Sequence, residues 1–465
     1  MESYLADLHA VRGAGTAETS GYPALANLLN EIGGVLKPKI TAIIHPANSG
    51  AGLPDGGFFS AKELRKRPDE TSLFELKPER GVLEVKPVDH DIGALAQSAQ
   101  VRGYLAHYGQ ILLTNYRSFA LYIWEGGRPA PGETFSLAEN EAAFWELARY
   151  SRGHKLLGER LVEYLRRVLL HAARLAAPRD LAAYLASYAR EARARVEAAP
   201  VNALAPISEA LGTALGIRFE GEKGAHFFRS TLIQTLFYGV FSAWVLWNEG
   251  SPKPGERFQW RTAAFHLGLP VLRTLFHQLA HPTHLGALGL EEVLDWTESA
   301  LARVERETFF ASFQPGEAVQ YFYEPFLAEF DPELRRQFGV WYTPPEIVKY
   351  MVAEVDRALQ ENFGLSKGLA DSRVVVLDPC CGTGAYLVET LRVIHERLKE
   401  NVGPDLAGLM VKEAAQKRLF GFELLPAPYV VAHLQLDLLL PLLVPLQPLT
   451  LCVSHTTSIE HYTAL

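Results

Sequence analysis

The chain has 465 residues, a hydrophobic fraction of 48% and a formal net charge of -8 at pH 7. Its length predicts about three domains, and its three cysteines are too few for the disulfide framework of a small secreted protein. The acidic total differs from the basic footprint of a complete DNA-binding protein, so contact with DNA must come from local Lys and Arg clusters. The N-terminal residues lack the basic and apolar regions of a secretory signal, and we therefore expect a cytoplasmic protein.

Acidic and basic residues surround a short predicted strand in the first third of the chain. Asp55 lies in a glycine-rich loop over residues 50–59. The apolar residues of segment 82–85 then predict a strand. Side chains two residues apart point to the same face of a strand, so Glu84 and Lys86 are expected to share one face.

A predicted helix and two predicted core strands follow this segment. Gln100 and Tyr104 are one helical turn apart. Residues 111–115 and 119–124 have the apolar composition of strands. Together with the preceding loop and strand, this order resembles the PD-(D/E)xK nucleases.

The resemblance implies a role for each polar residue of the region. Asp55 and Glu84 would bind Mg²⁺ through carboxylate oxygens, the hard ligands that this ion prefers. Lys86 would activate or orient the attacking water, and Gln100 and Tyr104 would form the Q-x-x-x-Y element of some nuclease branches. A simpler interpretation exists, because Glu-x-Lys triplets also form ion pairs on solvent-facing strands and an Asp-Gly step is an ordinary turn.

Further polar residues of the chain have weaker support. Glu18 is a candidate for the helix carboxylate found in many such nucleases. Two basic clusters are candidate phosphate contacts, although solvated helix or loop faces are the favoured interpretation. Their members are Arg65, Lys66 and Arg67, and Arg166, Arg167 and Arg174.

From about residue 135 to residue 331, the apolar spacing predicts helices throughout. They span residues 156–175, 180–198, 226–247 and 290–310, with a loop over 250–255. No Walker A sequence occurs, so an ATP-driven motor is not expected. Isolated histidines on helices are more typical of structural positions than of metal ligands, and this holds for His226, His277, His281 and His284.

A capped helix is predicted after residue 342. Thr343 suits the N-cap, Pro344 suits the first helical position, and Glu346 follows Thr343 by three residues as in a capping box. By itself, a capped helix needs no functional explanation. One apolar helical face is formed by Ile347, Val348, Met351, Val352 and Val355.

Segment 374–387 is the most informative part of the chain, because it predicts a strand, a glycine turn and a helix. Its first four residues form the apolar block of a central parallel strand. Asp378 follows at the carboxyl end of the strand, where α/β sheets bind their ligands. Gly382 and Gly384 allow a sharp turn and a close approach of the backbone to a ligand, and residues 385–398 repeat apolar residues at helical spacing. An α/β turn with incidental glycines is the alternative.

A third segment, residues 419–433, predicts a strand that ends at Glu423 and a helix that follows Pro426 and Pro428. A carboxylate at the end of such a strand can accept hydrogen bonds from two vicinal hydroxyls, because it has two oxygens. Alone, the pattern is weak evidence of a ribose site.

In this order, the three segments resemble motif X, motif I and the ribose-binding strand of the N6-adenine DNA methyltransferases. Trp341 departs from the Phe or Tyr of the family but keeps an aromatic ring, and Gly421, Glu423, Pro426 and Ala432 match the third motif. The resemblance implies an S-adenosylmethionine pocket in a Rossmann-like sheet. Its cofactor-binding residues would be Tyr342, Thr343, Pro344, Asp378, Pro379, Cys380, Gly382, Gly384 and Glu423.

The resemblance stops at about Asp437. The catalytic [DNS]-P-P-[YF] motif of the family does not occur, and the only Pro-Pro pair is Pro344-Pro345. From residue 438 onward the composition fits neither a helical nor a strand period, and we expect a prematurely ended or frameshifted tail. A membrane span is a weaker alternative because three prolines interrupt the apolar run, so no membrane partner is expected.

The order of the segments resembles a single-chain type II, type IIG-like, restriction–modification enzyme that cuts and methylates double-stranded DNA. It also resembles type ISP enzymes without their helicase. The expected fold is multidomain α/β: a PD-(D/E)xK nuclease over residues 1–134, an all-α connector over 135–331, the N-terminal part of a Rossmann-like methyltransferase over 332–437 and an aberrant tail over 438–465. Two alternatives stay open. One is a metabolic or protein methyltransferase, and the other is a non-catalytic DNA- or partner-binding subunit completed by a second polypeptide.

Overall fold

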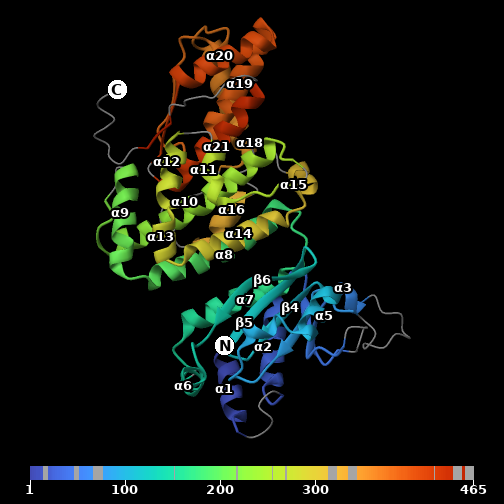
Figure 1. The fold of residues 1–465 in the computed structure, drawn as a ribbon. Coiled ribbons are helices and arrows are strands. Elements are labelled where there is room, and N and C mark those ends of the chain that lie inside the picture. The colour runs from blue at the N-terminus through green and yellow to red at the C-terminus, as the bar shows by residue number, and fades with distance from the viewer. Residues whose placement is uncertain are drawn as a thin grey trace. The chain divides into compact units, whose positions relative to one another are not determined.

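A computed structural model places the chain in two compact units, Met1–Arg174 and Leu175–Leu465 (Figure 1). We describe each unit by itself. The structure describes residues 1–13, 19–46, 52–65, 77–150, 152–215, 218–253, 255–267, 270–312, 322–332, 343–423, 425–443 and 453–455.

The first unit is built on a six-stranded sheet in which the strands follow one another in chain order. Strand β3 pairs with β4 in parallel, and the other neighbours pair antiparallel. The parallel pair needs a crossover connection, which is supplied by two helices between β3 and β4. The strands are β1 (Ile40–Ile44), β2 (Gly56–Ser60), β3 (Val82–Val85), β4 (Gln110–Thr114), β5 (Ser118–Glu125) and β6 (Arg128–Ser136).

Helices cover both faces of this sheet. They are α1 (Glu2–Val11), α2 (Tyr22–Val35), α3 (Ala61–Arg65), α4 (Ile92–Leu95), α5 (Ala99–Tyr108), α6 (Glu141–Arg149) and α7 (Lys155–Leu170). Leu112 lies in the core that α1, α2, α6 and α7 share, whereas Ile111 and Leu113 lie in the core under α4 and α5. Alternate residues of one strand face opposite sides of a sheet, so the continuous apolar run in β4 reflects a strand that is buried on both faces.

The first unit extends beyond residue 134, where the sequence placed the end of the nuclease-like region. It runs to Arg174, because β6 continues to Ser136 and helices α6 and α7 pack on its core. The strands expected at 82–85, 111–115 and 119–124 correspond to β3, β4 and β5 within a few residues.

The second unit begins with a helical assembly. Its elements are α8 (Pro178–Ala198), α9 (Val201–Leu215), α10 (Gly221–Glu249), the 3₁₀ helix η2 (Trp260–Thr262), α11 (Ala263–His266), α12 (Pro270–Leu279), α13 (Pro282–Ala287), α14 (Leu290–Ala302), α15 (Arg306–Ser312) and α16 (Glu324–Phe330). The helices expected from the sequence are present, although the one over 290–310 is divided into α14 and α15. Residues Gly224–Glu249 of α10 are long and apolar enough to cross a membrane, but 94% of the relevant window is buried inside the protein. A core helix passes the same test, and α10 carries the buried aromatic residues Phe237, Phe241 and Trp244.

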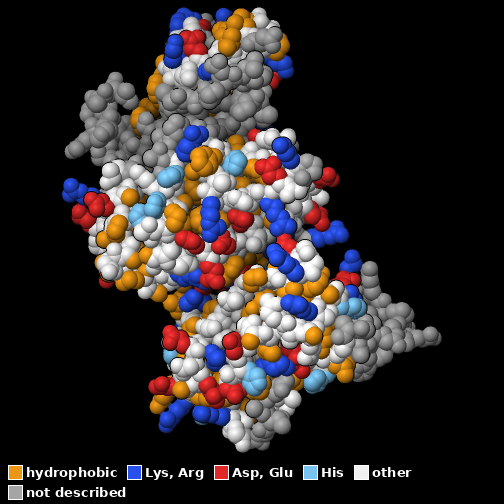
Figure 2. Space-filling model, viewed as in Figure 1, with side chains coloured by type: hydrophobic (Ala, Val, Ile, Leu, Met, Phe, Trp, Pro, Cys, Tyr) orange, Lys and Arg blue, Asp and Glu red, His pale blue; other side chains and the backbone are white. Residues whose placement is uncertain are grey.

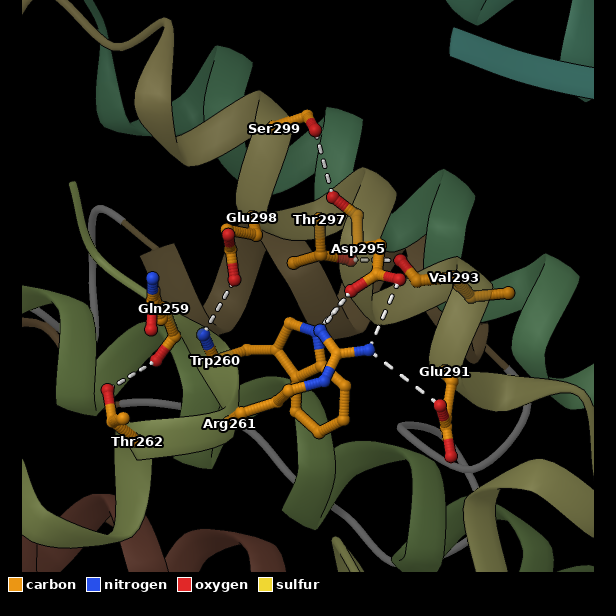
Figure 3. A network of polar contacts seen from close by, with 10 residues as sticks. All are labelled: Gln259, Trp260, Arg261, Thr262, Glu291, Val293, Asp295, Thr297, Glu298 and Ser299. Carbon is orange, nitrogen blue, oxygen red and sulfur yellow. Dashed lines mark hydrogen bonds and ion pairs between the residues drawn. The ribbon is translucent and has the colours of Figure 1, made fainter. Parts of the chain in front are cut away.

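Hydrogen bonds and an ion pair connect η2 with α14 (Figure 3). The Trp260 backbone N–H donates to Glu298 Oε2 at 2.8 Å, and the indole Nε1 donates to Asp295 Oδ1 at 2.7 Å. Arg261 Nη1 donates to the same Asp295 oxygen at 2.6 Å, and its guanidinium lies over the Trp260 ring. Burial raises the pKa of the Glu298 carboxyl. These hydrogen bonds and ion pairs join residues of η2 to residues of α14, so we interpret the network as structural.

The C-terminal part of the second unit is a three-stranded parallel sheet with the order β7-β8-β9. The strands are β7 (Val376–Asp378), β8 (Leu419–Glu423) and β9 (Val453–His455). Its helices are α18 (Pro345–Glu361), the 3₁₀ helix η5 (Gly368–Ala370), α19 (Ala385–Val402), α20 (Pro404–Lys417) and α21 (Pro426–Leu443). The strand–turn–helix order expected for 374–398 is therefore present in β7 and α19.

One expectation about this region is wrong. β7 is an edge strand among the described strands, and Val375 and Leu377 are 63% and 53% exposed, so it is not a buried central strand. The apolar residues 438–443 continue α21 as a helix, and residues 453–455 form a strand beside β8. Residues 444–452 and 456–465 lie outside the described residues, so the expected aberrant tail stays a prediction.

Candidate functional site

The first candidate site lies at the end of β3. Glu84 is buried, with 3% of its surface exposed, and its Oε1 lies 2.8 Å from Lys86 Nζ. Gln100 Nε2 donates to the same oxygen at 3.2 Å. The expected common face of Glu84 and Lys86 is thus present, and a buried carboxylate needs such partners because its desolvation is costly.

Helix α5 brings Gln100 and Tyr104 to this carboxylate. The Ser98 side chain caps the helix by accepting a hydrogen bond from the Val101 N–H, which fixes where its first turn begins. Gln100 Nε2 donates to the Tyr104 hydroxyl at 3.1 Å, as residues four apart on a helix can do. Burial raises the pKa of Tyr104, and the negative charges of Glu84 and Asp55 act in the same direction. The phenol is therefore protonated at neutral pH and can donate a hydrogen bond.

Asp55 completes the arrangement from the loop before β2. Its Oδ1 accepts a hydrogen bond from the Tyr22 hydroxyl at 2.8 Å, and its Oδ2 accepts one from the Val85 N–H at 2.8 Å. Tyr22 is the buried first residue of α2. Both oxygens are therefore oriented by the protein. Sequence reasoning missed Tyr22, because nothing in its local pattern indicates a partner that lies 33 residues away.

The structure thus brings Asp55, Glu84, Lys86, Gln100 and Tyr104 into one cluster, which we call the β3 cluster. Among the described residues, no group of three or more His, Cys, Asp or Glu side chains could hold a metal ion. Two carboxylates with water at the remaining positions are a normal donor set for Mg²⁺, which keeps several waters. The β3 cluster fits that ion in ligand type. Glu18, Lys66 and Arg67 lie outside the described residues.

The second candidate site is the turn between β7 and α19. Asp378 Oδ1 accepts a hydrogen bond from the Cys380 N–H at 3.2 Å, and no partner for its buried Oδ2 is found among the described residues. Burial raises the pKa of the Asp378 carboxyl. Gly382 and Gly384 have φ angles of +55° and +83°, a region that favours glycine. The expected need for glycine at both positions is met.

The end of β8 holds this turn in place. Glu423 Oε2 accepts a hydrogen bond from the Gly382 N–H at 2.9 Å, and Oε1 accepts one from the Leu425 N–H at 2.7 Å. The Cys381 N–H donates to the Phe422 carbonyl at 2.9 Å. The residue expected at a ribose site therefore lies directly beside the glycine turn.

Helix α21 contacts the same turn through Ala432, which matched the expected motif, and through Gln435, which sequence reasoning missed. Gln435 is buried, and its Nε2 donates to the Thr383 carbonyl at 2.6 Å. A Cβ atom added to Gly384 would meet the Cβ of Ala432 at 3.1 Å. Ala432 is the last residue that matched the expected motif, and Gln435 lies three residues after it.

The two neighbouring thiols of the turn differ in environment. Cys380 is exposed, whereas Cys381 is buried. Burial, together with the nearby Asp378 and Glu423 carboxylates, raises the pKa of the Cys381 thiol to about 12. At neutral pH, Cys381 is thus an inert packing residue.

The helix expected to line the cofactor pocket is present as α18, but its first residue and its N-cap differ from the prediction. Thr343 and Pro344 are described, and Trp341 and Tyr342 lie outside the described residues. The helix α18 begins at Pro345, its N-cap is Pro344, and no side chain caps it, so the expected Thr343 N-cap and capping box are wrong. Pro344 lies in an extended conformation, with ψ of 138°, which shifts the helix start by one residue.

The apolar face expected on α18 is also only partly buried. Val348 and Val352 are buried, whereas Ile347, Met351 and Val355 are exposed. The Tyr386 hydroxyl, in the first turn of α19, donates to Met351 Sδ at 3.1 Å. This contact connects α18 with the helix that follows the glycine turn.

Two of the proposed phosphate contacts and one of the histidines have partners within the protein. Arg167 is buried in an ion pair with Glu133 at 2.8 Å, so it is not a DNA contact, and Arg166 pairs with Glu163 on the same helix. His281 Nδ1 accepts a hydrogen bond from the Thr283 N–H, as expected for a structural histidine. On the face shown in Figure 2, acidic and basic side chains are interspersed.

With this geometry established, comparison with known proteins identifies the class of the C-terminal region. Residues 316–439 match the family model of the N-6 DNA methylases. The match includes α18, the glycine turn and β8, so the resemblance expected from these segments is confirmed. It covers less than a third of the chain, and no curated protein sequence matches.

Solved structures similar to the chain include restriction–modification enzymes. A DrdV–DNA complex matches 96% of this chain at 18% identity, with a TM-score of 0.36, and this match covers 39% of the DrdV chain. The ATP-dependent type ISP restriction–modification enzyme LlaBIII, bound to DNA, matches 68% of this chain and 19% of its own at 18% identity and a TM-score of 0.40. The type IIG restriction endonuclease BpuSI matches 98% of this chain and 43% of its own at 13% identity and a TM-score of 0.24. The chain therefore spans less than half the length of these proteins.

Proposed function

We propose that the chain is the nuclease and cofactor-binding part of a restriction–modification protein, with an S-adenosylmethionine-dependent N6-adenine DNA methyltransferase joined to a Mg²⁺-dependent endonuclease. The observation that carries the methyltransferase part is the Glu423 carboxylate beside the glycine turn, within the segment that matches the N-6 DNA methylases. Double-stranded DNA is the proposed substrate, and the DNA complexes among the similar structures agree with it.

The residues of the turn suit the binding of a nucleoside cofactor. The missing Cβ of Gly382 leaves open space in which a ligand could approach the backbone, whereas that of Gly384 leaves room for Ala432. Glu423 has two oxygens, each with a second lone pair that can accept from a ribose hydroxyl. Bound S-adenosylmethionine would supply the methyl group, while Asp378 holds the turn through the Cys380 N–H.

The endonuclease part of the proposal rests on the β3 cluster. Asp55 and Glu84 would hold the ion, and bound Mg²⁺ would polarise the phosphate and lower the pKa of a water molecule. Lys86, whose Nζ contacts Glu84, would orient that water. Gln100 keeps the Glu84 carboxylate in position from α5.

The decisive experiment measures ligand binding. Isothermal titration calorimetry of the purified chain with S-adenosylhomocysteine should show one site, and removal of Glu423 should weaken it. A nicking assay on supercoiled DNA, with and without Mg²⁺, tests the nuclease separately. Absence of binding contradicts the methyltransferase proposal, and metal-independent or absent nicking contradicts the nuclease proposal.

A second candidate is a non-catalytic DNA- or partner-binding subunit that a second polypeptide completes. The exposed Leu377 on the edge strand β7 and the exposed Val375 directly before that strand favour this candidate, because parallel strands are normally covered on both faces. Size-exclusion chromatography with multi-angle scattering tests whether the chain by itself is monomeric. The cytoplasmic location remains a prediction from the sequence.

A further inference from the structure

Three consecutive residues of the glycine turn are each held by a different residue of segment 423–435. The Gly382 N–H donates to Glu423 at 2.9 Å, and the Thr383 carbonyl accepts from Gln435 at 2.6 Å. Gly384 packs so closely on Ala432 that an added Cβ would lie 3.1 Å from the Ala432 Cβ. The turn is therefore held by its Gly382 N–H donor, by its Thr383 carbonyl acceptor and by the close packing of Gly384.

Two of these three contacts come from one face of α21. Ala432 and Gln435 are three residues apart on the helix, so their side chains are neighbours. Both are buried, with exposures of 0% and 2%. A polar side chain in such surroundings is costly unless it is hydrogen-bonded, and the amide of Gln435 has the Thr383 carbonyl as its partner.

We propose that Gln435 is a positioning residue for cofactor binding, which fixes the Thr383 carbonyl and so holds the glycine turn and the adjoining Glu423 carboxylate in the arrangement that binds the ligand. This inference rests on the proposed S-adenosylmethionine site. Gln435 does not touch the cofactor but acts through the turn. Binding groups are effective when neighbouring contacts hold them rigidly, and a buried helix supplies that rigidity better than the turn itself.

A purely structural Gln435 predicts a different result. In that case its removal lowers the stability of the unit but leaves the folded turn and its ligand affinity unchanged. The two roles therefore separate when affinity and local backbone protection are measured on folded protein.

The test compares Gln435→Met, which keeps the size of the side chain and removes the donor, with Gln360→Met. Gln360 is a matched control on α18, since its Nε2 donates to Asp356 Oδ2 at 2.8 Å within the same unit. Calorimetry with S-adenosylhomocysteine should show a dissociation constant raised roughly tenfold in Gln435→Met, the effect of one lost hydrogen bond. Hydrogen–deuterium exchange of peptides over 379–388 should rise in the ligand-free Gln435→Met protein. Neither change is expected in Gln360→Met.

If Gln435→Met does not fold, Gln435→Asn replaces it, because the shorter side chain keeps the amide but cannot reach Thr383. Affinity within twofold of the parent, with unchanged exchange over 379–388, would overturn the inference. A parent protein that does not bind S-adenosylhomocysteine contradicts the proposed function instead. In that event the exchange measurement still decides whether Gln435 holds the turn.

Discussion

The Glu423 carboxylate accepts a hydrogen bond from the Gly382 N–H at 2.9 Å, although 41 residues separate the two in the sequence. This bond joins the end of β8 to the glycine turn after β7, so the carboxylate and the turn are presented to a ligand as one surface. A cofactor that bonds to Glu423 would therefore meet a turn whose backbone is already ordered.

Replacement of Glu423 by alanine should weaken the binding of S-adenosylhomocysteine by about 1.5–3 kcal/mol, the range for hydrogen bonds to a charged group. The loss has two parts, because the ligand loses an acceptor and Gly382 loses its partner. Glu413→Ala is the matched control, since Glu413 is exposed on α20 and pairs only with Lys417 in the described contacts. Calorimetry that gives equal affinity for Glu423→Ala and the parent would remove Glu423 from the site.

Substitution of Glu84 by glutamine should abolish Mg²⁺-dependent nicking of supercoiled DNA. The amide keeps the size of the side chain but loses a charged oxygen ligand for the ion. It also removes the charge of a carboxylate that contacts the Lys86 ammonium at 2.8 Å, so some stability should be lost as well. Circular dichroism must show that the variant is folded, and Glu139→Gln on the surface provides the control. Nicking by Glu84→Gln at the parental rate would exclude the β3 cluster as the nuclease site.

The structure makes clear which features local sequence can predict. The strand at 82–85 and the helix after Gly384 depend on short-range periodicity and turn chemistry, and both are present as β3 and α19. The spacing of Glu84 and Lys86 predicted their common face for the same reason. The face on which a side chain lies within one element is therefore readable from the sequence, although the expected cap at Thr343 was wrong.

Contacts between distant segments were not predictable in the same way. Tyr22 and Asp55 are 33 residues apart, and Gln435 and Thr383 are 52 apart, so each pair depends on how whole elements pack. The burial of Val375 and Leu377 was mispredicted because it depends on which strand lies beside β7. Local composition predicts whether a segment is a helix or a strand, but it does not predict which other elements pack against it.

Tyr22→Phe should weaken metal binding at the β3 cluster by roughly tenfold, because loss of one hydrogen bond frees the Asp55 carboxylate to rotate. The change removes a single oxygen atom from a buried ring. Tyr4→Phe is the matched control, since the Tyr4 hydroxyl is also buried and donates to the Tyr116 carbonyl at 2.8 Å. Titration with Mn²⁺, followed by electron paramagnetic resonance, measures the affinity directly. Equal weakening in both variants would indicate a general loss of packing and contradict the orienting role.

The two thiols of the glycine turn should react at different rates with iodoacetamide. Cys380 is exposed, whereas the burial that raises the pKa of Cys381 to about 12 keeps its thiol protonated at pH 8. The thiolate is the reactive form, so labelling should occur at Cys380 first and become slower in the presence of S-adenosylhomocysteine. Mass spectrometry of the peptide that contains both residues measures this order, and Cys380→Ser is the control. Preferential labelling of Cys381 would show that the turn is open in solution.

The 465-residue chain should not transfer methyl groups to adenine in double-stranded DNA. Its sequence contains no [DNS]-P-P-[YF] motif, and without that loop a flipped adenine has neither an aromatic stacking partner nor acceptors for its amine. S-adenosylhomocysteine can still bind, because the glycine turn and Glu423 lie on β7, β8 and the segments beside them. A radiolabelled methyl-transfer assay on mixed-sequence duplex DNA tests this, with an intact adenine methyltransferase as the positive control. Transfer to adenine above background by the purified chain would contradict the prediction and assign the catalytic contacts to residues already present in it.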